Sequence, residues 1–291
     1  MRSLSPPKNR FLRGIYLMGR RYLHHSVAIQ GAALAFYLLF TIFPLLIFVS
    51  ALLGLLDLDV AAIIRGLAAL LPKEVLSLVE MYLTHVSSNR SPRLLLFGLF
   101  FSIYFPMRAT GALMHAVRTA YHLGPPKAMA VHWLKTLLYT ALLIVTISLT
   151  LVLMTVGDRV LYFAVEHFHL PAFAAQTWAR LRFPLAALAG YFALFFLYAM
   201  AQDTRQPWRN IWPGTLAALA AWMGISWLYA LYVNNFAHYS VLYGSIGTLI
   251  VLLIWLNLTA VTLILGAELN GVLISLRKDR CQQALDDEEK F

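Results

Sequence analysis

The chain has 291 residues, of which 60% are hydrophobic and only 12% are charged, and its mean hydropathy is +0.71. Soluble domains carry roughly 25% charged residues, so this composition excludes an ordinary soluble domain and predicts a single domain embedded in lipid. The net charge of +10 fits either nucleic acid or an anionic membrane surface. The placement of the charges along the chain decides between them.

Residues 1–26 form a basic segment that contains no acid. Such a juxtamembrane cluster is attracted to anionic cytoplasmic lipid, so we expect anionic phospholipid as a partner and do not expect nucleic acid. The stretch FLRGIYLMGRRYL pairs an apolar face with basic side chains, which predicts an amphipathic helix along the inner membrane surface. The six basic residues are Arg2, Lys8, Arg10, Arg13, Arg20 and Arg21.

Six membrane-spanning helices are predicted from the stretches that are poor in charge. A spanning helix needs roughly 20 apolar residues, and the first stretch is too long for the apolar part of a signal peptide. The last stretch has 58 residues without a charge, so it must fold back on itself, with a turn over residues 234–245. The stretches cover residues 27–56, 94–117, 136–157, 183–202 and 210–267.

The distribution of Lys and Arg predicts the orientation. An even number of spans places both termini on one side, and sixteen of the 23 Lys and Arg fall on that side. Because basic residues are enriched in cytoplasmic segments, both termini are predicted to be cytoplasmic. The sequence thus divides into a basic segment (1–26), a six-helix transmembrane domain (27–276) and a charged tail (277–291), in a multi-pass membrane protein.

Two outer loops are longer than a turn requires. Residues 60–86 and 160–179 both place apolar residues at helical spacing among polar ones, which predicts amphipathic helices at the outer interface. Residues 60–86 could instead enter the membrane as a hairpin.

Two ionisable residues, Arg108 and Glu268, fall within the predicted spans. Both are expected in the inner half of the membrane, where opposite charges could form a salt bridge. Asn257 precedes Glu268 by about three helical turns and so lies on nearly the same helix face. We therefore predict a polar vestibule that opens to the cytoplasm and is formed by Gln30, Arg108, Asn257 and Glu268.

A plainer interpretation stays open for each of these residues. Arg108 could extend its guanidinium to the interface, Glu268 could already be in water, and Asn257 could simply join two helices. Pro44 and Pro106 each remove a helical hydrogen bond, so both predict helix kinks.

The small residues of the first and fifth spans permit close packing within the chain or in a homo-oligomer. They include Gly31, Ala32, Ala33 and Ala35, and Ala217, Ala218, Ala221 and Gly224.

Signs of enzyme chemistry are few. The sequence has no phosphate-binding glycine loop, no HExxH motif and a single cysteine, Cys281, in the tail. The pairs His24/His25 and His167/His169 lack an acid cluster beside them, so a metal site is not expected. We therefore predict no catalytic residues, no metal and no cofactor.

Three segments carry a resemblance to a known family. QGAALAFYLLFTIFPLLIFVSALLGLL (Gln30–Leu56), ATGALMHAVRTAYHL (Ala109–Leu123) and YGSIGTLIVLLIWLNLTAVTLILGAELN (Tyr243–Asn270) resemble the YihY/BrkB family of bacterial inner-membrane proteins, with GAELN as the most specific piece. The resemblance implies a six-helix inner-membrane protein. Members of that family have been associated with virulence and serum resistance, with export of lipid or lipopolysaccharide precursors, and with a transfer-RNA-processing ribonuclease.

Three functions follow as hypotheses. The first is a transporter or lipid flippase without its own ATP-hydrolysing domain, in which Arg108 attracts the anionic group of an amphiphilic substrate and Glu268 is its counter-ion or protonation switch. The second is a membrane scaffold or envelope assembly factor that transports nothing. The third and weaker hypothesis is the ribonuclease, which would need carboxylates gathered around phosphate.

Overall fold

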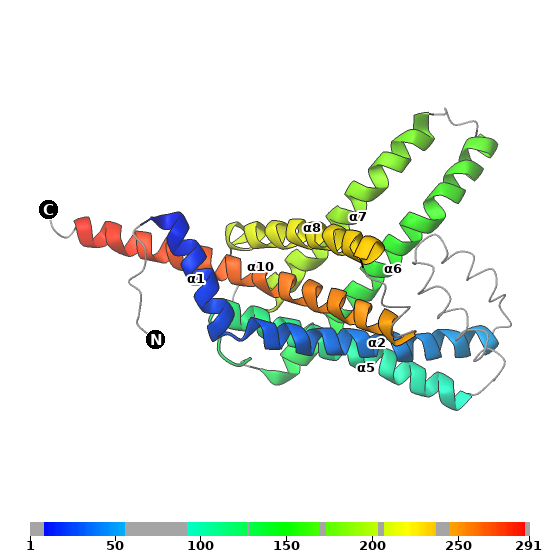
Figure 1. Ribbon diagram of the computed structural model, residues 1–291, viewed down its shortest axis with the longest axis horizontal. Coiled ribbons are helices and arrows are strands. Elements are labelled where there is room, and N and C mark those ends of the chain that lie inside the picture. The colour runs from blue at the N-terminus through cyan, green and yellow to red at the C-terminus, as the bar shows by residue number, and fades with distance from the viewer. Residues whose placement is uncertain are drawn as a thin grey trace.

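The computed structural model describes residues 9–55, 92–126, 128–168, 173–202, 207–236 and 245–288. All regular structure in this part of the chain is helical (Figure 1), which confirms the prediction of an all-α fold. The elements are α1 (Arg10–His24), α2 (Val27–Leu55), α5 (Pro92–Ala120), α6 (Met129–Phe168), α7 (Phe173–Met200), the short 3-10 helix η1 (Trp208–Asn210), α8 (Trp212–Phe236) and α10 (Ser245–Glu288).

Six of these helices are long and apolar enough to cross a membrane, which confirms the predicted number of spans. The uncharged stretch of 58 residues folds back as predicted, since α8 and α10 pack against each other. The candidate spans are Val27–Leu45, Leu96–Ala120, Met129–Ile147, Arg180–Met200, Trp212–Val233 and Leu249–Lys278.

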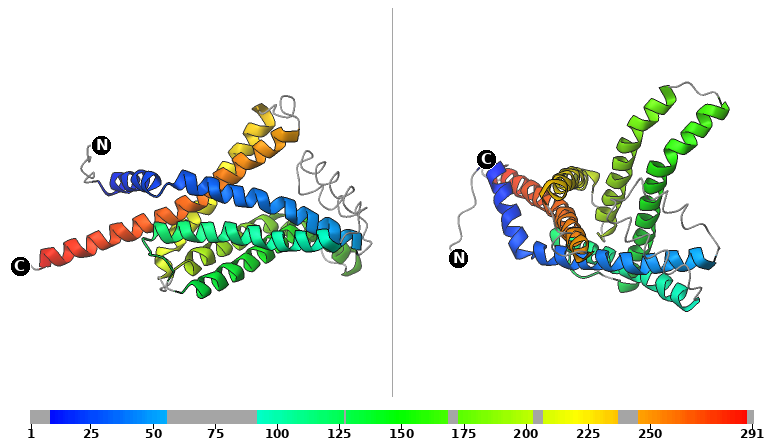
Figure 2. Two further views of the ribbon diagram at one scale, coloured as in Figure 1. Left: turned by 90° about the horizontal axis from the view of Figure 1, so that it is seen from below. Right: turned by 45° about the vertical axis from the view of Figure 1, so that its right-hand side comes forward.

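The helices α2, α5 and α10 run side by side, and the hairpin of α6 and α7 leans away from them at one end (Figures 1 and 2). The C-terminal part of α10 lies at the opposite end, where α1 contacts it near Ser275 and Leu276. We call this the inner end, because the charge distribution predicts that it faces the cytoplasm. Two chain ends on one side are what an even number of spans requires.

The helix α1 leaves the direction of the spans at an elbow between His24 and Val27. Ser26 adopts a positive φ of 52° there, a conformation that is uncommon for a residue with a side chain. One face of α1 packs against the inner part of α10, where a Cβ atom on Gly14 would lie 3.9 Å from the Leu276 side chain. The opposite face exposes Leu12, Ile15 and Leu23. This amphipathic helix was predicted, and its contact with lipid stays a prediction.

Only some of the small residues predicted to permit close helix packing do so within the chain. A Cβ atom on Gly31 would meet Val261 on α10 at 2.5 Å, so α2 and α10 approach closely at this glycine. By contrast, a Cβ atom on Gly224 in α8 would have no neighbouring atom within 4 Å. The small residues of α8 thus do not all serve packing within the chain.

The predicted helix over residues 160–179 does not form as a separate element. The helix α6 continues to Phe168 and α7 begins at Phe173, so most of this stretch extends the two long helices. Polar residues end a membrane span but do not by themselves end a helix, because charged residues have good helix propensity. Residues 60–86 lie outside the described part of the chain.

The prolines predicted to kink helices lie within continuous helices, and the charged tail is partly helical. The helices α2 and α5 run on through Pro44 and Pro106, and α7 also contains a proline, Pro184. The kinks at Pro44 and Pro106 stay predictions. The helix α10 continues into the charged tail as far as Glu288.

Candidate functional site

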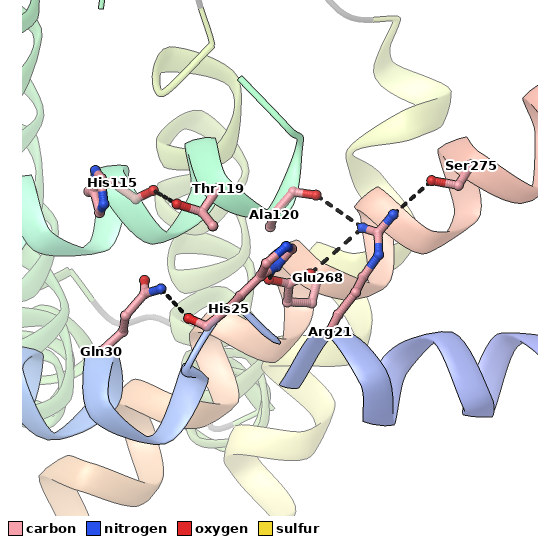
Figure 3. Close-up of polar contacts among 8 residues, drawn as sticks. All are labelled: Arg21, His25, Gln30, His115, Thr119, Ala120, Glu268 and Ser275. Carbon is pink, nitrogen blue, oxygen red and sulfur yellow. Dashed lines mark hydrogen bonds and ion pairs between the residues drawn. The ribbon is translucent and has the colours of Figure 1, made fainter. Parts of the chain in front are cut away.

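A buried carboxylate at the inner end organises the first polar site. Glu268 on α10 is 1% exposed, and its Oε1 atom lies 2.5 Å from His25 Nδ1 at the elbow (Figure 3). An ionised carboxylate only accepts hydrogen bonds, so His25 donates from Nδ1. The other oxygen, Oε2, lies 3.7 Å from Arg21 Nη1. A buried carboxylate needs such partners, because an unpaired charge in the interior is costly. We call Arg21, His25 and Glu268 the inner-end cluster.

Arg21 connects three helices. It donates from Nη1 to the carbonyl oxygen of Ala120, at 3.1 Å, and from Nη2 to Ser275 Oγ, at 2.7 Å (Figure 3). Ala120 is the last residue of α5, where backbone carbonyls lack helical partners and the helix dipole is negative. Burial lowers the pKa of the Arg21 guanidinium, and the charge of Glu268 opposes that shift. Arg21 thus links α1 and α10 to the end of α5.

Two more histidines surround His25. The rings of His24 and His122 each have their centroids 5.5 Å from that of His25. His122 follows α5 in a left-handed conformation, with φ of 55°, and Leu123 N–H donates to the carbonyl of Arg118, which is a typical helix end. Shielding from water lowers the pKa of His122, and the charges of Arg21 and His25 lower it further.

The GAELN segment of α10 makes a different contact at each of its key residues. Asn270 is fully buried; its Oδ1 accepts a hydrogen bond from Gly214 N–H, at 2.7 Å, and its Nδ2 donates to the Ile211 carbonyl, at 2.8 Å. Asn270 therefore satisfies backbone groups at the start of α8, as a capping side chain does. A Cβ atom on Gly266 would collide with Ala218 and would lie 2.7 Å from the Tyr198 hydroxyl. Packing and charge pairing together account for this segment.

Arg118 and Lys135 bind backbone carbonyls just after the end of α7, as Arg21 does at the end of α5. Arg118 donates to the carbonyls of Ala201, at 3.0 Å, and Gly124, at 2.5 Å, while Lys135 donates to the Gln202 carbonyl, at 3.2 Å. These cations, which the sequence analysis counted only as signs of orientation, stabilise the inner ends of helices.

Arg108 forms a second polar site, separate from the inner-end cluster. It is the middle residue of the candidate span Leu96–Ala120, whose bounds follow from helix length and composition. Its depth in the membrane, which the sequence analysis places in the inner half, stays a prediction. Its side chain is exposed; Nη2 donates to the Tyr37 hydroxyl, at 3.2 Å, and the guanidinium lies 5.4 Å from the centroid of the Tyr37 ring. The contact combines a hydrogen bond with a cation–π interaction.

The expected ion pair between Arg108 and Glu268 does not form. Glu268 pairs with Arg21 and His25, whereas Arg108 pairs with Tyr37. The physical reason is depth: Arg108 stands twelve residues before Ala120, the residue that Arg21 contacts, or about 18 Å along α5 at about 1.5 Å per residue. The suggestion that Glu268 is in water is also wrong, because this side chain is buried.

Of the four residues predicted to form a vestibule, the structure brings two together. Gln30 Nε2 donates to the His25 carbonyl, at 2.6 Å, so Gln30 joins Glu268 at the inner end (Figure 3). Asn257 is half-buried and stands eleven residues before Glu268 on α10, which separates the two by about 16 Å along the helix at about 1.5 Å per residue. The sequence analysis missed His25 and Arg21 as partners of Glu268, because both precede it by 243 positions or more and only the fold brings them together.

In the described part of the chain, no group of three or more His, Cys, Asp or Glu side chains could hold a metal ion. The contacts of the inner-end cluster join α1, α5 and α10, and the exposed guanidinium of Arg108 can attract an anion.

Comparison with known proteins identifies relatives over nearly the whole chain. A family model described as virulence factor BrkB matches residues 18–290. The putative ribonuclease-like protein YfkH of Bacillus subtilis (strain 168) is 29% identical over 258 residues, which cover 89% of this chain and 94% of that protein. A UPF0761 membrane protein of Pseudoalteromonas translucida (strain TAC 125) is 31% identical over 32% of this chain and 31% of its own length. Another, of Xanthomonas campestris pv. campestris (strain B100), is 30% identical over 38% and 27%. No solved structure matches.

Proposed function

This chain belongs to the family described as virulence factor BrkB, and from that premise we propose that it is an inner-membrane transporter or flippase for an anionic amphiphile. The membership confirms the resemblance to the YihY/BrkB family.

The observation that carries the proposal is the position of Arg108. A cation at the centre of a bilayer costs roughly 2.5 to 3.5 kcal/mol on insertion scales, and such residues usually mark a pathway for ions or substrates. Arg108 is exposed at the centre of its span, and its hydrogen bond goes to a neutral hydroxyl rather than to a carboxylate. An arriving anionic group would supply the missing negative charge.

Polar side chains on the same face of α5 support a route to Arg108 from the inner end. His115 follows Arg108 by seven residues and Thr119 by eleven, so all three lie on one face of the helix. His115 is exposed, and the Thr119 hydroxyl donates to the His115 carbonyl (Figure 3). Gln30 and Tyr37 are likewise seven residues apart on the neighbouring helix α2.

Membrane lipids are the partners that this proposal needs. The exposed apolar side chains of α1, namely Leu12, Ile15 and Leu23, lie beside Arg20, which is also exposed. A helix with this arrangement lies well in an anionic lipid surface. We propose that α1 rests on the inner leaflet and so positions the elbow near the lipid headgroups.

A scaffold for envelope assembly is the second candidate function. The inner-end cluster supports it, because Glu268 and Arg21 are buried and, together with His25, connect α1, the elbow, α5 and α10. Such an arrangement stabilises a helix bundle without requiring a substrate. A homo-oligomer would fit either function, and the open space around Gly224 leaves room for one. The ribonuclease activity in the name of the Bacillus protein is not proposed for this chain.

Reconstituted vesicles test the first candidate. An anionic lipid with a fluorescent headgroup is placed in both leaflets, and an impermeant quencher added outside reports the rate at which inner-leaflet lipid reaches the surface. The wild-type protein is expected to raise that rate above the rate of protein-free vesicles. Arg108→Gln should lower it about tenfold, which corresponds to loss of a charge-assisted contact.

The matched control is Arg182→Gln, because Arg182 also lies over an aromatic ring, that of Phe183, but stands near the end of its span. This variant should move lipid at the wild-type rate. Equal rates for wild type, Arg108→Gln and protein-free vesicles would refute the transporter and favour the scaffold.

A further inference from the structure

Aromatic side chains on α2 and α5 form a continuous row of ring contacts that runs from Arg108 toward the outer end. The centroids of consecutive rings lie 4.4 to 5.7 Å apart along the row, and the row passes from one helix to the other between Phe40 and Phe105. We call it the aromatic platform; its members in order are Phe36, Phe40, Phe105, Phe101 and Phe97.

The platform is accessible from outside the chain. Phe36, Phe40 and Phe97 are exposed, and Phe101 and Phe105 are half-buried. Eleven residues separate Phe97 from Arg108 on α5, so the platform extends about 16 Å at about 1.5 Å per residue. This length is close to half of a hydrocarbon core of about 30 Å.

Arg108 and Tyr37 stand at the inner edge of the platform. The Phe36 and Tyr37 rings lie 5.7 Å apart, and the Arg108 guanidinium lies over the Tyr37 ring. The surface therefore offers one cation at its inner edge and a long row of rings beyond it. Its ligand must have an anionic head and a long apolar chain that leads from the head toward the outer leaflet.

We propose that this surface binds an isoprenoid phosphate, with the phosphate on Arg108 and the chain along the aromatic platform. Arginine pairs readily with phosphate oxygens through parallel hydrogen bonds. Pairs of aromatic rings prefer offset or edge-to-face geometry because each ring has a quadrupole, and we extend this preference to the planar π systems of carbon–carbon double bonds. The double bonds of an isoprenoid chain provide planar groups along its length, whereas a saturated acyl chain provides none. The inference rests on the proposed function for the role of Arg108 and adds the class of lipid.

Photochemical crosslinking tests the proposal on the full chain in phosphatidylcholine nanodiscs. Three probes that carry the same diazirine are compared: an isoprenoid phosphate, the corresponding isoprenoid alcohol, and a saturated phosphatidic acid. Mass spectrometry measures labelling within residues 94–118. The isoprenoid phosphate should label this segment about tenfold more than the alcohol, as expected for a charge-assisted contact, and more than the phosphatidic acid.

Variants separate the two parts of the site. Arg108→Gln should reduce labelling by the phosphate probe to the level of the alcohol. Phe40→Leu combined with Phe101→Leu should reduce it about threefold, in line with the energy of aromatic contacts. The control is Phe192→Leu combined with Phe196→Leu on α7, where both rings are 48% exposed but belong to another helix. This control should leave labelling of residues 94–118 unchanged, and thermal unfolding should confirm that all variants fold.

Two results would overturn the inference. Labelling that is unchanged by Arg108→Gln or by the platform variant shows that the site is not used, and equal labelling by the saturated phosphatidic acid shows that the platform does not select the chain. The proposed function fails differently: intact labelling without lipid movement contradicts transport but preserves the site, whereas lipid movement without labelling contradicts the site alone.

Discussion

His25 Nδ1 lies 2.5 Å from Glu268 Oε1, so the elbow before α2 is tied to the last spanning helix across 243 positions of sequence. Because Arg21 reaches the same carboxylate and the end of α5, one acid connects four segments at the inner end. Its removal should therefore affect the whole bundle.

Glu268→Gln is expected to lower the free energy of unfolding by about 3 to 5 kcal/mol, the cost of leaving a buried partner charge uncompensated. Denaturant unfolding in detergent, followed by circular dichroism, measures the change. Lys278→Gln is the control on the same helix; Lys278 is exposed, so the change should stay within about 0.5 kcal/mol. Equal unfolding midpoints for wild type and Glu268→Gln would contradict the structural role of the cluster.

Gly266→Ala should separate α8 from α10. The added Cβ atom would collide with Ala218 and approach the Tyr198 hydroxyl, and overpacking of this kind costs about 1 to 3 kcal/mol. Gly224→Ala is the matched control, since nothing lies within 4 Å of the new atom. It should be neutral or should stabilise the helix by up to about 1 kcal/mol. The prediction is wrong if both alanine variants unfold at the same denaturant concentration.

The stability should depend on pH through His122. Its pKa is lower in the folded protein than in the unfolded chain, so the unfolded chain binds more protons between the two pKa values. The contribution of His122 to the free energy of unfolding is therefore fully present above the pKa of the unfolded chain, about 6.5. It is lost as the pH falls toward the lower pKa of the folded protein.

His122→Gly should weaken this dependence and should also raise stability at pH 7 by about 1 kcal/mol, because glycine adopts a positive φ without strain. Unfolding curves from pH 5 to pH 8 measure both effects. His115→Gln, on the same helix, should keep the pH dependence of the wild type. A His122→Gly variant with an unchanged pH profile would assign the dependence to other groups.

Tyr37→Phe keeps the ring under Arg108 but removes the hydroxyl that accepts its hydrogen bond. A net contribution of about 0.5 to 1.5 kcal/mol per hydrogen bond corresponds to a reduction of about two- to tenfold in binding of an anionic lipid, measured by crosslinking yield. Tyr104→Phe removes a hydroxyl about one helical turn before Arg108 on α5 and should bind as the wild type does. Similar losses in both variants would show that the hydroxyl of Tyr37 has no special role.

The contact of α1 with lipid can be measured at Ile15. A single cysteine at this position, in a chain that also carries Cys281→Ser, is labelled with an environment-sensitive dye. Emission should shift to shorter wavelength in nanodiscs with anionic lipid relative to neutral ones, because both apolar burial and charge attract the helix. A dye at position 14 instead, on the face that packs against α10, should respond less. Identical spectra in the two lipids would contradict the surface location.

The six spans could be predicted because uncharged stretches of the required length are rare outside membranes, and the fold-back of the last stretch followed from its length alone. The boundary near residues 160–179 was wrong because polarity marks where a membrane ends and not where a helix ends. Burial of Glu268 was also missed, since its partners come from α1, whose path across α10 is set by an elbow that no sequence pattern encodes.

Arg108 illustrates the same limit. Its place within a span was evident from the sequence. The predicted pairing with Glu268 would have required similar positions along the bundle, whereas in the structure the two residues lie several helical turns apart. Tyr37 became its partner because α2 and α5 pack side by side in opposite directions. Opposite charge is thus a weaker guide than position along adjacent helices.

The length of α10 has a mechanical consequence. Its 44 residues make one rod of about 66 Å at about 1.5 Å per residue, roughly twice the thickness of the hydrocarbon core. α10 packs closely against α8 at Gly266, and the same helix continues through Glu268 to Glu288. A force applied to this helix at its exposed residues Arg277 and Lys278 would therefore reach the ion pairs of Glu268 with Arg21 and His25 through the helix backbone.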